Sequence, residues 1–158
     1  MEPPVYRLFP TLIVAASLAL GCPSAYDRTY EAEVNRLDAQ HQVNRQEALK
    51  YVAVVLFAVG SSEIDEAGFK ELDWFLQKIA PYGNLDVGVM GYADSTGSEA
   101  HNLPLSDERA RAVQDYLIAR GIPAGRISIG GFGSSDPARE NTTSRGRRQN
   151  RRAEVRVR

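Results

Sequence analysis

The chain has 158 residues, which is enough for one domain with a short appendage. Its apolar fraction of 43% and charged fraction of 25% exclude a disordered or fibrous protein. A formal net charge of -1 excludes a polyanion binder that works by bulk charge, and the single cysteine, Cys22, excludes an intrachain disulfide and argues against a Cys/His metal site.

An apolar run covers residues 8–20 and ends at Gly21-Cys22. The run has about 13 residues, too few for a spanning helix of about 20 but suited to a secretory signal. A small residue directly before a lone cysteine resembles the lipobox of bacterial lipoproteins. The resemblance implies a signal peptide at 1–21, lipidation of Cys22 and anchoring in the outer membrane with the rest of the chain in the periplasm. The alternative is an uncleaved or ordinary signal with an incidental cysteine.

The following stretch, 22–49, is polar and rich in Glu, Arg, Gln and Asn. Tyr30, Val34, Leu37 and His41 are spaced along one narrow helix face, which predicts a partly helical tether. A coiled-coil seam is the sharper alternative, but it needs three or more heptads.

A regular pattern begins after residue 50. The β-branched apolar run at 51–57 predicts a buried strand, and apolar residues at 3 to 4 spacing predict a helix over 65–79. Alternating apolar residues predict a second strand over 85–92.

A second helix is expected to begin at Ser106, a natural N-cap, and to end near Gly121. The remaining elements are a third strand, a loop and a half-exposed fourth strand, expected over 126–130, 131–143 and 151–158. The order β-α-β-α-β-β predicts an α/β (α+β) domain at 50–158, with helices packed on one face of a small mixed sheet.

Two spaced motifs follow the second predicted strand. Gly91-Tyr-Ala-Asp94-Ser-Thr-Gly97 precedes Asn102-Leu-Pro-Leu-Ser-Asp-Glu-Arg109-Ala110. Together with Gly131-Phe-Gly133 and Asn150-Arg-Arg-Ala-Glu-Val155, they resemble the OmpA-like peptidoglycan-binding domain. That family shows Gly-x-Thr-Asp-x-x-Gly at a strand end and Asn-x-x-Leu-Ser-x-x-Arg-Ala on the next helix. The likeness covers about 53–158.

The resemblance implies recognition of meso-diaminopimelate, whose free end in a peptidoglycan stem peptide carries one ammonium and one carboxylate. It assigns Asp94 to the ammonium and Arg109, expected in the first turn of its helix, to the carboxylate. Arginine suits this role because its planar fork can bind a carboxylate through two parallel bonds. Asn102 is assigned to ligand contact or to shaping the loop. The supporting residues are Arg152, Thr96 and Gly97.

Each charged residue also has a purely structural interpretation. An Asp before Ser-Thr-Gly, as at Asp94, commonly forms a turn. Arg109 could be a solvated helix residue, and Arg152 could be a solvated side chain on an exposed strand. Two positions depart from the family pattern, Ala93 for threonine and Ala58 for aspartate, and they bear on affinity more than on ligand class.

The predicted function is non-covalent peptidoglycan binding that tethers the outer membrane to the wall, with no enzyme activity, cofactor or metal. The alternative is an envelope scaffold, Tol-Pal-like or associated with secretion or a motor, in which other envelope proteins are partners and wall binding is secondary. No Gly-x-Ser-x-Gly, His-Glu-x-x-His or phosphate-loop motif favours catalysis. Eight arginines at 139–158 could bind the phosphates of a nucleic acid. The predicted export to the cell envelope argues against this alternative. We expect these arginines instead to contact anionic wall polymer or lipid headgroups.

Overall fold

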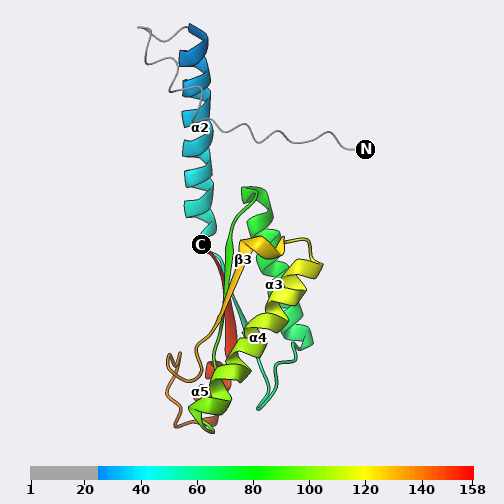
Figure 1. Ribbon diagram of the computed structural model, residues 1–158. Helices are drawn as coiled ribbons and strands as arrows, with labels where there is room; N and C mark the ends of the chain where they lie inside the picture. The colour runs from blue at the N-terminus through cyan, green and yellow to red at the C-terminus, as the bar shows by residue number, and fades with distance from the viewer. Residues whose placement is uncertain (1–24) are drawn as a thin grey trace. The chain divides into compact units, whose positions relative to one another are not determined.

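A four-stranded mixed sheet organises the domain (Figure 1). In the computed structural model, which describes residues 25–158, the strands are β1 (Val52–Leu56), β2 (Val87–Gly91), β3 (Ile127–Gly131) and β4 (Arg152–Val157). Their order is β1-β4-β2-β3, with β4 antiparallel to both of its neighbours and β2 parallel to β3. The predicted small mixed sheet is therefore confirmed, and each strand lies within two residues of its expected bounds.

The last strand in sequence, β4, is an interior strand of the sheet. The expected alternation is confirmed, because Ala153, Val155 and Val157 are fully or almost fully buried on one face. The opposite face of β4 is not simply exposed to solvent, because Arg152 on that face is only 4% exposed. Its side chain therefore has partners inside the domain, described below.

Helix α3 (Glu66–Ile79) forms where the apolar spacing predicts it. The carboxylate of Asp65 caps its first turn by accepting a hydrogen bond of 2.8 Å from the Gly68 backbone N–H. Leu72, Phe75 and Ile79 form the buried stripe that packs toward β1.

Helix α4 (Glu99–Ala119) begins eight residues earlier than predicted. Its N-cap is Ser98, and the helix continues through Pro104. Ser106 is wrong as the cap: it is fully buried inside the helix, where its hydroxyl donates to the Leu103 carbonyl and accepts from the Gly133 N–H. Arg109 therefore lies in the middle of α4 and not in its first turn.

A short helix that the sequence did not predict, α5 (Ser144–Asn150), precedes β4. The Thr143 hydroxyl caps it by accepting from the Gly146 N–H at 2.9 Å. The helix has only seven residues and no apolar stripe, so its sequence shows no helical periodicity. Figure 1 shows that α5 and the beginning of α4 lie at the same end of the sheet.

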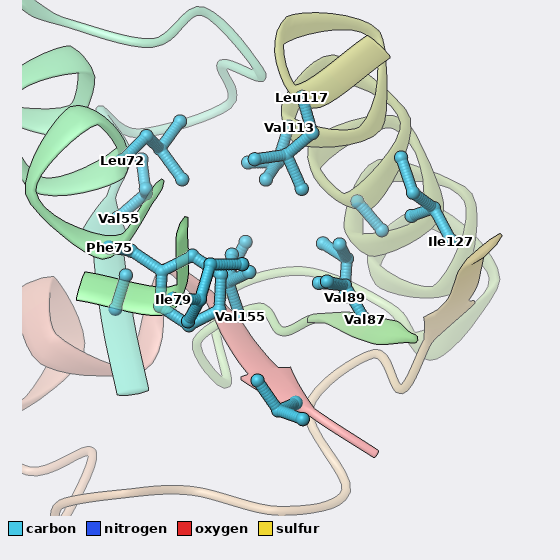
Figure 2. Packing of buried hydrophobic residues seen from close by; sticks show 14 of the residues in the cluster. Val55, Leu72, Phe75, Ile79, Val87, Val89, Val113, Leu117, Ile127 and Val155 are labelled. Carbon is cyan, nitrogen blue, oxygen red and sulfur yellow. The ribbon is translucent and has the colours of Figure 1, made fainter. Parts of the chain in front are cut away.

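The core lies between the sheet and the two long helices, α3 and α4 (Figure 2). Val55, Val87, Val89 and Val155 from the strands face the apolar stripes of the helices. α3 contacts β1, while α4 contacts β2 and β3. Both helices therefore cover one face of the sheet, as predicted.

The polar segment before β1 forms helix α2 (Ala25–Ala48). The compact unit that contains the sheet begins at Val43, and Ala48 is fully buried in its core. Among residues 25–158, no helix is both long and apolar enough to cross a membrane. The predicted signal peptide and Cys22 lie outside the described residues.

Two paired glycines let α4 approach the sheet closely. Gly91 of β2 lies opposite Gly131 of β3 in the parallel register. A Cβ at Gly91 would lie 1.9 Å from the Ser106 carbonyl oxygen, and one at Gly131 would lie 2.6 Å from the Asp107 nitrogen. Because backbone atoms occupy this space, α4 packs directly on the strand ends at Ser106 and Asp107.

We expect Gly91→Ala to lower the free energy of unfolding by about 3 kcal/mol or more, because the helix backbone would have to move to admit a methyl group. Urea denaturation of the whole chain measures this. Gly125→Ala is the matched control, since a Cβ there meets nothing within 4 Å. Equal stability of the two variants would contradict the close approach of α4.

Candidate functional site

The loop after β2 holds Asp94, which is 6% exposed. One carboxylate oxygen accepts a hydrogen bond of 2.8 Å from the Thr96 backbone N–H and closes a tight turn. The other oxygen accepts from Nη1 of Arg151, also at 2.8 Å, in an ion pair that is almost completely buried. Asp94 is thus both a turn former and a buried negative charge.

Competing effects set the pKa of Asp94. Burial raises the pKa, while the hydrogen bond from Arg151 and those from the Thr96 backbone and side chain lower it, and Arg151 lowers it further by its charge. The lowering effects prevail, so the pKa lies below its ordinary value and the carboxylate is ionised at neutral pH.

Arg109 reaches from the middle of α4 into the same region and is fully buried. Its guanidinium donates to three backbone carbonyls, those of Ser61 at 2.9 Å, Tyr92 at 2.8 Å and Ala58 at 3.2 Å. It also lies over the ring of Phe57, 5.2 Å from the centroid. Arg109 is therefore not the solvated helix residue of the alternative interpretation.

Burial lowers the pKa of Arg109 to about 10, and the positive charge of Arg151 lowers it as well, while Asp94 opposes both. The guanidinium therefore remains charged at neutral pH. Its three bonds to the described residues use three of five N–H groups, which leaves two donors for another partner.

Asn102 lies near the start of α4 and is 3% exposed. Its Nδ2 donates to the backbone carbonyl of Asp94 at 3.1 Å. This bond attaches the Asp94 loop to the helix that carries Arg109, so Asn102 shapes the loop as one of its two expected roles requires.

Asp94, Arg109 and Asn102 line one pocket of about 200 Å³, as do Arg151 and the turn residues Thr96 and Gly97. We call this the Asp94–Arg109 pocket. His101 is exposed and also lines it. The pocket brings one carboxylate and two guanidinium groups together, so its own charge is positive.

The supporting arginine suggested by the sequence, Arg152, lies outside this pocket. Its guanidinium pairs with Glu154 at 2.7 Å, donates to the Asp136 carbonyl and lies 3.8 Å from the centroid of the Tyr92 ring. Its neighbour Arg151 occupies the pocket instead. The Asn-Arg-Arg motif predicts which segment borders the pocket. Which of its two arginines faces Asp94 depends on the residue at which β4 begins.

An amide network holds the loops around the pocket. Asn150 exchanges hydrogen bonds with the backbone of Arg139, at 2.9 and 2.7 Å, and donates to the Asn141 side chain at 2.8 Å. The same Asn141 oxygen accepts from the Ser95 N–H at 3.1 Å. The end of α5 is thereby linked to the loop that carries Asp94. Within the described part of the chain, no group of three or more His, Cys, Asp or Glu residues could hold a metal ion.

We expect Asp94→Asn to lower the free energy of unfolding at pH 7 by about 1–3 kcal/mol, because Arg151 loses its charged partner. The lowered pKa of Asp94 means that this stabilisation is complete above the ordinary carboxyl pKa near 4 and is lost as the pH falls through the lower folded value. Urea denaturation should show the same difference from wild type at pH 7 and 5.5 and a smaller one below about pH 4. An undiminished difference at pH 2.5, or an equal loss in the exposed control Asp115→Asn, would contradict this.

Comparison with known proteins gives relatives for most of the domain. The Mycobacterium tuberculosis protein named peptidoglycan-binding protein ArfA is 38% identical over 101 residues, which cover 64% of this chain and 31% of ArfA. The probable lipoprotein YiaD of Escherichia coli is also 38% identical over 101 residues, covering 64% of this chain and 46% of YiaD. The chain therefore spans less than half the length of these relatives.

Solved structures share the fold. The peptidoglycan-associated lipoprotein of Burkholderia pseudomallei superposes with a TM-score of 0.62 at 23% identity, over 67% of this chain and 90% of that one. The sequence pattern of the OmpA family matches residues 56–151, which include every residue that lines the Asp94–Arg109 pocket. The chain belongs to the OmpA family.

Proposed function

We propose that this domain binds peptidoglycan non-covalently and recognises the free end of diaminopimelate in the stem peptide. The observation that carries the proposal is the presence of Asp94, Arg109 and Arg151 in one pocket. ArfA, a relative over 64% of the chain, is named for peptidoglycan binding. A ligand end with one ammonium and one carboxylate matches the two signs of charge in the pocket.

The charges suggest how such a ligand would be held. Its ammonium would add a partner to the Asp94 carboxylate, and its carboxylate would face the two unused N–H donors of Arg109. Arg151, now paired with Asp94, would lie between the two ligand charges. With a zwitterion bound, three positive and two negative charges would form one network in a partly desolvated pocket, where charge-assisted bonds contribute about 1.5–3 kcal/mol each.

Recognition of this kind needs no catalytic step. The pocket offers hydrogen bonds and charge, and Arg109 stays protonated at neutral pH. We therefore propose a binding module rather than an enzyme, with a wall peptide as its ligand and with no cofactor, metal or nucleic acid.

We further propose that acylation at Cys22 anchors the chain in the outer membrane, with the domain in the periplasm. Each buried methylene contributes about 0.8 kcal/mol, and two acyl chains usually suffice for stable anchoring. The 24 residues of α2 have a helical length of about 36 Å, which suits a spacer between a lipid and a wall-binding domain. YiaD, which shares the domain, is named a probable lipoprotein.

Asp94→Ala and Arg151→Gln are each expected to reduce retention on purified sacculi by tenfold or more, because each removes a charge from the pocket. The measurement is co-sedimentation of the whole chain, with Asp115→Ala and Arg111→Gln as matched exposed controls on α4. Arg109→Ala is a poorer test, since it also leaves three carbonyls without their donor. Full retention of both pocket variants, with circular dichroism showing a folded domain, would contradict the proposal.

Cys22→Ser is expected to abolish incorporation of radiolabelled palmitate and to release the chain from the membrane fraction, since the cysteine is the only thiol. Ser24→Ala is the neighbouring control and should keep the label. Persistent labelling of Cys22→Ser would disprove this site of lipidation, while leaving the proposed wall binding untouched.

A further inference from the structure

A second hollow, of about 390 Å³, lies next to the Asp94–Arg109 pocket. It is bounded by the loop between β1 and α3 and by α5. Arg151 lines both cavities, and the loop after β1 borders both, with Val59 and Gly60 on the first pocket and Ala58 and Ser61 on the hollow. The two cavities are therefore adjacent, and one ligand can contact both. We call the second cavity the Arg148 hollow, after the arginine at its α5 side.

Opposite charges line the two sides of the Arg148 hollow. Arg148 and Arg151 come from the α5 side, and Glu63 and Asp65 from the loop side. Because these four charges cancel, the hollow does not favour a compact polyanion such as phosphate. It fits a peptide end, which presents a carboxylate to the arginines and N–H groups to the acidic side.

The walls also include apolar atoms from β1 and the following loop. Leu56, Phe57 and Ile64 line the hollow beside the charged groups. The Phe57 side chain is buried in the core, so the partly exposed Leu56 and Ile64 provide the surface for a small aliphatic group adjacent to the ligand carboxylate.

Of the two arginines that line the hollow, Arg148 is the one whose charge has no partner among the described residues. Six of the eight arginines at 139–158 donate hydrogen bonds within the domain. Arg148 is exposed and makes no such bond or ion pair with the described residues. Most of the arginine surplus, which the sequence suggested for wall polymer or lipid headgroups, therefore has partners inside the domain.

Arg151 has one terminal nitrogen that remains available. Its Nε donates to the Phe57 carbonyl at 3.1 Å and its Nη1 to Asp94. The bonds to the described residues therefore leave Nη2 without a partner. Arg148 and Arg151 can together surround one carboxylate.

We infer that the Arg148 hollow binds the residue that follows diaminopimelate in the same stem peptide, a terminal D-alanine with a free carboxylate. This inference rests on the proposed function, because it requires the diaminopimelate end to occupy the Asp94–Arg109 pocket. The D-alanine carboxylate pairs with Arg148 and Arg151, its methyl group packs on Leu56 and Ile64, and its amide N–H faces Glu63. The site thus prefers a tetrapeptide stem to a tripeptide stem.

Isothermal titration of the whole chain with three synthetic stem peptides tests this inference. The probes are the tripeptide that ends at diaminopimelate, the tetrapeptide that ends in D-alanine, and the tetrapeptide with its terminal carboxylate amidated. We expect the tetrapeptide to bind roughly tenfold more tightly than the tripeptide, and the amidated form to lose this advantage. In Arg148→Gln the ratio of the two affinities should approach one, while the exposed α5 control Arg145→Gln keeps the wild-type ratio.

The outcomes separate the inference from the proposed function. If the tripeptide binds and the tetrapeptide binds no better, or if Arg148→Gln keeps the wild-type ratio, the Arg148 hollow is not the D-alanine site and wall recognition by the first pocket stands. If none of the three peptides binds the folded chain, the proposed function fails and this inference fails with it.

Discussion

The buried guanidinium of Arg109 is the interaction on which the rest of the site depends. Burying a charge costs much free energy unless it is hydrogen-bonded, and the carbonyls of Ala58, Ser61 and Tyr92 accept from three of the five N–H groups. Two of these carbonyls belong to the loop after β1 and one follows β2, so a single side chain joins two segments far apart in sequence. The cation that would bind a ligand carboxylate thus also fixes the shape of its pocket.

Packing of backbone on backbone places that cation. Gly91 and Gly131 allow the backbone of α4 to rest on the strand ends, and Arg109 follows Ser106 by less than one helical turn. Amide side chains, Asn102 and Asn150, hold the loops on either side. A pocket whose charges are fixed before the ligand arrives loses little entropy on binding, which favours recognition of a small zwitterionic group.

Much of this arrangement could be predicted from the sequence, where periodicity and motif spacing carry the information. The strands and α3 follow from apolar spacing, while Asp94, Arg109 and Asn102 follow from the resemblance of one spaced motif to the OmpA-like family. The start of α4 could not be predicted, because Ser106 has the composition of a cap and its helix-interior role depends on a bond from Gly133. The sequence also could not show that Arg151, and not Arg152, lines the pocket. Adjacent residues of a strand point to opposite sides, so a shift of one residue in register would exchange the two.

The most direct measurement is a comparison of two stem tripeptides by calorimetric titration, one ending in diaminopimelate and one ending in lysine. The lysine side chain presents the ammonium without the neighbouring carboxylate, so it keeps the partner of Asp94 and removes that of Arg109. The account predicts that the diaminopimelate peptide binds at least tenfold more tightly. Equal affinity for the two peptides would contradict the pairing of a ligand carboxylate with the buried guanidinium.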